Sequence, residues 1–216
     1  MKRLAVFISG SGSNFRKIHE GTLAGEIQAA IKLVITNNPD CAGAEYARAQ
    51  QLAVYKYPAR DLGVDDLLQQ LSEVGIDILL LAGYIKLVPQ EVVARYPRRI
   101  LNIHPALLPR FGGKGFYGRK VHEAVLAAGE RKSGPSVHFV DEKYDHGAVV
   151  AQAAVPVLPD DTPETLAQRV LTQEHILYPK VVAALCRGDI HWAVDNRPVI
   201  DPPLDMNNLI PRQEKA

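Results

Sequence analysis

The stretch Leu4-Ala5-Val6-Phe7-Ile8-Ser9-Gly10-Ser11-Gly12-Ser13-Asn14, close to the start of the chain, decides the fold. It opens with a continuous apolar run, which is typical of a parallel strand covered on both faces. A turn rich in serine and glycine follows, and residues 15–23 then have helical spacing. Free amides at such a helix start attract an anion. A tight strand-to-helix turn without a ligand is the alternative interpretation.

The same alternation continues outward from this stretch. Short apolar runs alternate with segments of helical spacing; the runs lie at residues 31–35, 53–57, 76–82 and 100–103, and the helical segments at residues 42–51, 64–74 and 89–96. This order predicts an α/β fold with a Rossmann-like, doubly wound and mostly parallel sheet. The run at residues 76–82 is the most hydrophobic, so we expect it at the centre of the sheet.

The second half of the chain predicts an antiparallel extension of this sheet. Apolar runs at residues 136–140 and 148–155 flank an acidic turn, which indicates a hairpin. Thr162 and Pro163 open a long helix that we expect to reach about Cys186, because threonine caps helices and proline fits their first turn.

Length and composition predict a single globular domain of 216 residues, with 47% apolar and 23% charged residues. We expect a phosphate-binding half at residues 1–100, a catalytic half at 101–190 and a loose tail at 207–216. The net charge of +1 favours neither nucleic acid nor an acidic membrane as a partner. The first apolar run is too short for a signal peptide and the two cysteines look reduced, so a cytoplasmic protein is expected. A monomer or homodimer is expected. The histidines and two cysteines lack metal-ligand spacing, so no metal is expected.

The glycine-rich turn can be tested for dinucleotide binding. A dinucleotide-binding turn needs a third glycine and an acidic residue at the end of the second strand. Asn14 stands in the region of the third glycine, and the second strand ends in Thr36-Asn37-Asn38-Pro39. A monophosphate is therefore favoured over NAD.

Polar side chains end the strand at residues 100–103. Asn102 and His104 are two positions apart, so their side chains leave the strand on the same face. Asp145, in the acidic turn, could pair with His104 and raise its pKa. A histidinium can protonate a leaving nitrogen while an amide steadies an oxyanion. A turn-capping asparagine beside a hydrogen-bonded core histidine is the structural alternative.

Two loops could complete such a site. Residues 83–89 form an apolar loop that could be ordinary packing or the wall of a slot for a flat ring. Residues 110–118 combine glycines with aromatic side chains and could be a mobile lid or a tucked turn.

At these motifs the chain resembles the phosphoribosylglycinamide formyltransferase family, the folate-dependent transformylases of purine biosynthesis. The resemblance is collinear over nearly the whole chain and rests on residues 9–14, 81–84, 102–109, 136–140, 145 and 173–175. It implies a fold of the formyltransferase type and transfer of a formyl group from 10-formyltetrahydrofolate, the co-substrate, to glycinamide ribonucleotide. The loop at residues 112–118 is several residues longer than in the members compared.

The resemblance also implies a role for individual residues. The amine would attack the formyl carbon, with Asn102 supporting the oxyanion, His104 acting as general acid and Asp145 keeping His104 charged. The residues implied to bind the nucleotide are Gly12, Ser13, Asn14, Gln173 and Glu174. The residues implied to bind the folate are Arg60, Ile85, Lys86, Leu87, Val88, Asn102, Asp141, Glu142, Lys143, Tyr144 and Asp145.

Three other functions compete with this one. A 10-formyltetrahydrofolate hydrolase is expected to carry an additional N-terminal domain, and this sequence opens on its first strand. A transfer-RNA formyltransferase needs a further C-terminal domain and a basic surface. A nucleotide-sensing module without activity would not need the asparagine and histidine pair.

Overall fold

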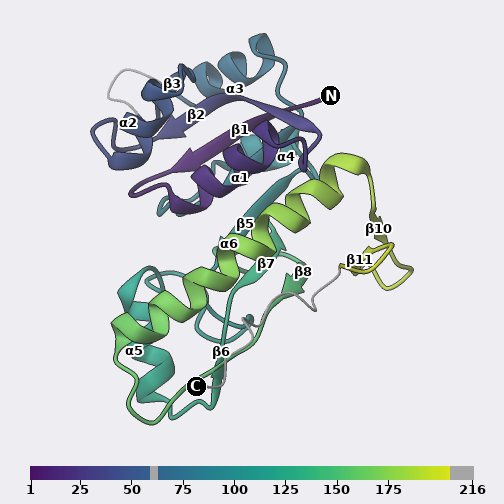
Figure 1. The fold of residues 1–216 in the computed structure, drawn as a ribbon. Helices are drawn as coiled ribbons and strands as arrows, with labels where there is room; N and C mark the ends of the chain where they lie inside the picture. The colour runs from purple at the N-terminus through teal and green to yellow at the C-terminus, as the bar shows by residue number, and fades with distance from the viewer. Residues whose placement is uncertain (59–62, 205–216) are drawn as a thin grey trace.

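A seven-stranded sheet forms the centre of the molecule (Figure 1). The computed structural model describes residues 1–58 and 63–204. The strands of this sheet are β1 (Lys2–Ile8), β2 (Ala29–Thr36), β3 (Val54–Lys56), β4 (Ile78–Leu81), β5 (Ile100–His104), β7 (Ser136–Phe139) and β8 (Val149–Gln152). The helices are α1 (Ser13–Leu23), α2 (Ala42–Ala49), α3 (Val64–Glu73), α4 (Gln90–Arg95), α5 (Arg119–Ala127) and α6 (Pro163–Arg187).

The strand order β3-β2-β1-β4-β5-β7-β8 confirms the predicted fold class. β1 to β5 pair in parallel, whereas β7 pairs antiparallel with both β5 and β8. β4 is the middle strand, as its continuous apolar sequence predicts, because both of its faces are covered.

The single strand predicted at residues 148–155 is wrong. β8 ends at Gln152, and Val155–Pro156 form β9, which pairs with β6 (Lys132–Ser133) in a separate two-stranded sheet. Between them the backbone passes so close to Gly134 that a Cβ there would lie 1.9 Å from the carbonyl oxygen of Ala153. An apolar run does not reveal such a crossing, because both strands are apolar. A further pair, β10 (Ile190–Trp192) and β11 (Pro198–Ile200), follows α6.

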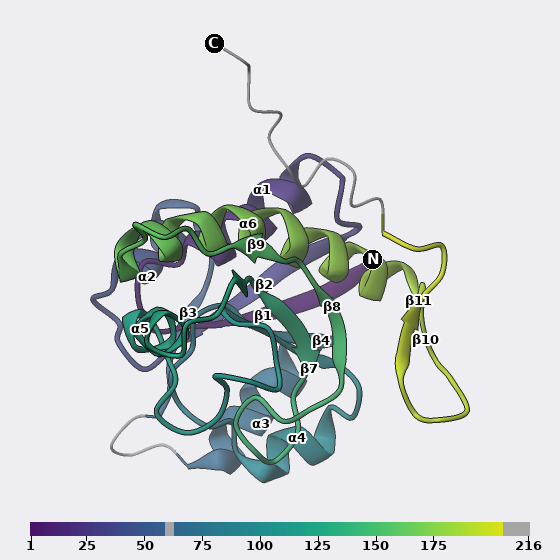
Figure 2. The same cartoon turned by 90° about the horizontal axis from the view of Figure 1, so that it is seen from below.

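Helices cover both faces of the sheet (Figure 2). Alternate residues of β1 enter different apolar clusters: Leu4 and Val6 pack with α1 and α6, whereas Phe7 packs with α3 and α4. This doubly wound arrangement leaves the carboxyl ends of the parallel strands free to carry polar side chains.

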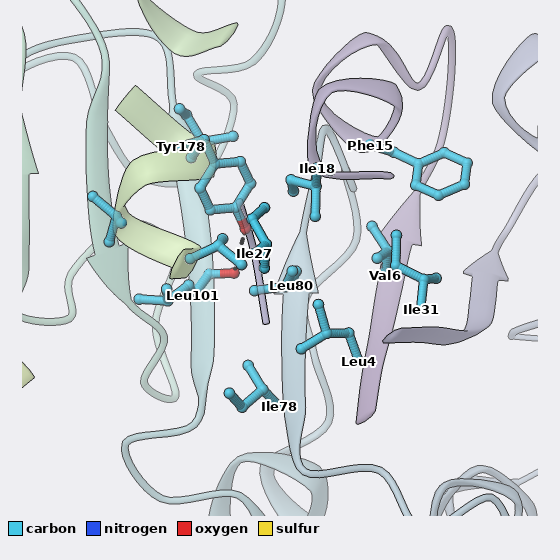
Figure 3. Packing of buried hydrophobic residues seen from close by; sticks show 14 of the residues in the cluster. Leu4, Val6, Phe15, Ile18, Ile27, Ile31, Ile78, Leu80, Leu101 and Tyr178 are labelled. Atoms are coloured by element: carbon cyan, nitrogen blue, oxygen red, sulfur yellow. Dashed lines mark hydrogen bonds between the residues drawn. The ribbon is translucent and has the colours of Figure 1, made fainter. Parts of the chain in front are cut away.

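α6 packs against strands from both halves of the chain. Thr162 caps it by accepting a hydrogen bond from the Thr165 amide, and Pro163 occupies its first turn, as predicted. Tyr178, fully buried on α6, places its hydroxyl 3.0 Å from the carbonyl oxygen of Leu101 (Figure 3). The same hydroxyl lies 3.1 Å from the carbonyl oxygen of Leu81. The helix is thereby fixed against the end of β4 and the start of β5. None of the helices in the described part of the chain is long and apolar enough to cross a membrane.

Candidate active site

A cavity of about 800 Å³ lies where β1, β4 and β5 end. The turn after β1, the loop after β4, the end of β5 and the segment before α5 all line it, together with one face of α6. Ligands of open α/β sheets bind at this edge, because the loops leaving neighbouring strands diverge there.

The glycine-rich turn forms one wall of the cavity. Gly12 has a φ of 70°, and a Cβ at this position would lie 2.8 Å from the Cα of Gly43, so only glycine fits. α1 starts at the next residue without a side-chain cap, which suits its first amides to an anion. Gly12, Ser13 and Asn14, the three predicted nucleotide-binding residues of this turn, all line the cavity.

Asn14 meets a residue 160 positions away. Its Nδ2 donates to Oε2 of Glu174 at 2.5 Å, and both side chains are buried. Burial raises the pKa of Glu174, and the hydrogen bond from Asn14 offsets part of that rise. Glu174 lines the cavity, but Gln173 does not, although it is buried beside Glu174 on α6. The predicted role of Gln173 stays a prediction.

The structure brings Asn102, His104 and Asp145 together at one end of the cavity. Nδ1 of His104 lies 3.4 Å from Oδ2 of Asp145, and Nδ2 of Asn102 lies 3.3 Å from Oδ1 of the same carboxylate. Nε2 of His104 lies 2.8 Å from the Phe111 carbonyl oxygen, which can only accept, so this nitrogen carries a hydrogen. In the neutral ring Nδ1 is then the free basic atom.

Burial and Asp145 act on the pKa of His104 in opposite directions. Burial lowers the pKa of His104, and the attraction of Asp145 and the hydrogen bond to Phe111 offset only part of this effect. The side chain is almost completely enclosed, so an imidazolium there loses more hydration than one carboxylate returns. Asp145 thus acts on the pKa of His104 in the predicted direction, and its role in keeping His104 charged stays a prediction.

His138 is a fourth member of this group, and no role was predicted for it. Its Nδ1 donates to the Phe139 carbonyl at 2.7 Å, which leaves Nε2 to accept from Nδ2 of Asn102 at 3.0 Å. The sequence shows His138 and Ser136 on one strand face, but not which residue of β5 they meet. Pairing of β7 with β5 sets Asn102 opposite His138.

Asp145 is held as a carboxylate. Burial alone would raise its pKa, but the positive charge that His104 can carry and the Gly113 amide lower it. The Gly113 amide donates to Oδ2 at 3.0 Å. Asp145 thus connects β5 to the segment at residues 110–118, which lines the cavity from residue 113 onward.

The residues predicted to bind the folate are only partly at the cavity. Ile85 and Tyr144 line it, and both side chains are more than one third exposed, which leaves apolar surface available to a ring. Lys86 and Leu87 point outward, and Val88 is buried in the apolar cluster beneath α3 and α4. The turn residues Asp141, Glu142 and Lys143 lie outside the cavity lining, and Arg60 lies outside the described residues. The folate-binding roles stay predictions.

Sequence reasoning did not single out several residues that line the cavity: Tyr84, Lys114, Phe116, Tyr117, Arg119, His122 and Glu164. Three of them, Lys114, Phe116 and Tyr117, belong to the segment at residues 110–118, whose path the sequence left open. Across residues 1–58 and 63–204, no group of three acidic, histidine or cysteine side chains could hold a metal ion.

Comparison with known proteins shows the family of this chain. The family described as "Formyl transferase" matches residues 2–182. Phosphoribosylglycinamide formyltransferase, chloroplastic, of Arabidopsis thaliana is 54% identical over 205 residues, which cover 92% of this chain and 70% of that protein. The chain belongs to the phosphoribosylglycinamide formyltransferase family. The fold class and the resemblance stated from the sequence are thereby confirmed.

Solved structures agree with this membership. The crystal structure of glycinamide ribonucleotide transformylase 1 from Symbiobacterium toebii matches with a TM-score of 0.84 and 36% identity, over 93% of this chain and 94% of that one. A formyltetrahydrofolate deformylase from Pseudomonas syringae also matches, with a TM-score of 0.82, over 92% of this chain and 65% of that one. At 20% identity, the second likeness shows a shared fold alone.

Proposed function

We propose that this protein transfers a formyl group from 10-formyltetrahydrofolate to the amine of glycinamide ribonucleotide, a step of purine biosynthesis. One observation carries the proposal: a phosphate-type turn and the Asn102, His104 and Asp145 group line the same cavity. The relatives of high identity are named for this reaction.

The formyl-folate supplies the carbon that is transferred. As the nucleotide amine bonds to that carbon, negative charge develops on the formyl oxygen. Both hydrogens of the Asn102 amide are directed at protein acceptors, to His138 at 3.0 Å and to Asp145 at 3.3 Å. We assign to the formyl oxygen the hydrogen that now points at Asp145, because its contact is longer and therefore weaker than the contact with His138.

His104 balances the protons. Its free Nδ1 takes up the proton that the attacking amine releases, and Asp145 stabilises the imidazolium at 3.4 Å. The same ring then gives a proton to the folate nitrogen as the bond between that nitrogen and the formyl carbon breaks. A lowered pKa at His104 suits this order, because the ring acts first as a base and then as an acid.

The decisive measurement is the release of tetrahydrofolate from 10-formyltetrahydrofolate with and without glycinamide ribonucleotide. We expect release only in the presence of the nucleotide, and His104→Ala should lower turnover by about 10²- to 10⁴-fold. Folate release that ignores the nucleotide would instead show hydrolysis, the activity of the deformylase that shares the fold.

The cytoplasmic location expected from the sequence is also kept as a proposal, as is a monomer or homodimer. The plant relatives are named chloroplastic, which makes a plastid the competing compartment. Fractionation of the source cells distinguishes the two, and light scattering of the purified protein gives the oligomeric state.

A further inference from the structure

The cavity offers little positive charge to a phosphate. The turn at residues 10–14 contributes amides and hydroxyls but no cation, and the face of α6 on the cavity carries Pro163, Glu164, Ala167, Leu171 and Glu174. A phosphate monoester bears about 1.5 to 2 negative charges at pH 7. A helix N-terminus supplies roughly half a positive charge. A phosphate at this turn therefore calls for a further cation.

Two cationic side chains, Lys114 and Arg119, line the cavity among the described residues if histidines are set aside. Arg119 is already engaged: its Nε lies 2.7 Å from Oε1 of Glu123, and its Nη1 pairs with Glu164. Lys114 makes no ion pair with any residue of the described ranges. Its ammonium group is the free cation of this part of the site.

The backbone on both sides of Lys114 is constrained. Gly112 packs so closely that a Cβ would lie 2.5 Å from Cδ2 of Leu108 and 3.1 Å from Cβ of Asp145. The Gly113 amide donates to Asp145, and the Gly113 carbonyl accepts from the Phe116 amide at 3.1 Å. Gly113 and Gly115 have φ values of 95° and 97°, which only glycine adopts readily. Lys114 is thus presented from a fixed turn.

We propose that Lys114 is a specificity-determining residue that binds the 5′-phosphate of the nucleotide substrate from the side of the cavity facing the glycine-rich turn. The inference rests on the proposed function and deepens it. A lysine acts here as a point charge on an otherwise cation-poor site. Gly113, the residue before Lys114, donates its amide hydrogen to Asp145. A phosphate bound by Lys114 therefore also holds the Gly113 amide against this carboxylate.

The test compares glycinamide ribonucleotide with the same molecule lacking its phosphate, glycinamide riboside. Lys114→Ala should lower kcat/KM for the nucleotide by about 10- to 100-fold, the usual worth of a charged hydrogen bond. Its kcat/KM for the riboside should stay at the wild-type value. Lys114→Arg should retain most of the nucleotide preference, because it keeps the charge.

Lys32→Ala is the matched control, because Lys32 is exposed on β2 away from the cavity and its loss changes the net charge equally. It should leave both substrates unaffected. The inference would be overturned if Lys114→Ala left the ratio of the two kcat/KM values, nucleotide over riboside, unchanged. No loss for either substrate and an equal loss for both would each give that result.

Calorimetric titration with ribose 5-phosphate separates this inference from the proposed reaction. Lys114→Ala should bind this probe about 10-fold more weakly than wild type, or weaker still. If wild type bound the probe through Lys114 but formylated no nucleotide, the proposed function would fail and the phosphate site would stand. If the two proteins bound the probe equally and formyl transfer were normal, the proposed role of Lys114 would fail and the proposed function would stand.

Discussion

At the scale of single residues, the balance between burial and charge decides how His104 works. The sequence shows an ionisable side chain beside an amide, and it offers Asp145 as a partner. In the structure, the cost of burial exceeds the help from Asp145, so the pKa of His104 falls. A group of this kind is poised to accept a proton before it donates one.

Asp145→Asn tests this balance. Asp145 raises the pKa of His104 against the effect of burial, so its removal should lower that pKa further. The imidazolium becomes harder to form, and turnover at pH 7 should fall by about 10²-fold or more. The kcat profile against pH checks this, and its controlling pKa should move to lower pH.

Asp195→Asn is the control for this variant, because Asp195 is an exposed partner of Arg197 outside the cavity. It should keep the wild-type profile. A wild-type profile in Asp145→Asn would mean that Asp145 does not act on the catalytic proton.

At the scale of elements, the start of α6 is fixed by a bidentate ion pair. Arg169 donates from Nη1 to Oδ2 of Asp161 at 2.6 Å and from Nη2 to Oδ1 at 2.8 Å. The Asp161 side chain is only 2% exposed. Arg169 is the main reason that the pKa of Asp161 lies well below its usual range. The pair secures the end of α6 whose first turns line the cavity.

Arg169→Ala should lower the free energy of unfolding by about 1 to 3 kcal/mol at pH 7, because Asp161 keeps its hydrogen bonds from Leu158 and Thr165 but loses its cationic partner. Since the pKa of Asp161 is depressed in the folded state, this stabilisation is complete above the unfolded pKa of about 3.9 and is lost progressively below it. Urea titrations at pH 7 and below pH 4 should show the difference from wild type shrinking in acid.

The exposed pair of Arg197 and Asp195 provides the comparison for this prediction. Its side chains are 76% and 52% exposed. Arg197→Ala should leave the free energy of unfolding close to the wild-type value, because solvent screens an exposed ion pair. Similar losses in the two variants would show that burial of Asp161 does not control the strength of its ion pair.

At the scale of the whole molecule, one apolar cluster contains residues from both halves of the chain. Leu4 and Val6 of the first half share it with Leu101 and Tyr178 of the second (Figure 3). The sequence predicts a division into two halves at about residue 100. Each half contributes residues to the site, but the two halves share one apolar core. We expect the halves to unfold together.

Tyr178→Phe tests this expectation. Removing a buried hydroxyl that bonds to Leu81 of β4 and Leu101 of β5 should lower the free energy of unfolding by about 1 to 3 kcal/mol. Fluorescence and circular dichroism should give the same single transition, shifted to a lower urea concentration. Two separate transitions would contradict a shared core.

The sequence by itself determined the strands and helices around the site. Apolar period and turn chemistry are local properties, so the glycine-rich turn, the strand carrying Asn102 and His104, and the capped start of α6 could be read from neighbouring residues. The strand at residues 148–155 is the exception, because its break depends on the crossing over Gly134.

Only the tertiary structure decided what the site residues meet. Asn14 and Glu174 lie 160 positions apart, and Asn102 meets His138 through a strand pairing that no local pattern specifies. The lowered pKa of His104 depends on the protein packed around it, and the path of residues 110–118 depends on the anchor at Asp145. The sequence thus supplied the reactive groups, whereas packing across distant segments set their partners and the basicity of His104, because contact and desolvation exist only in the folded chain.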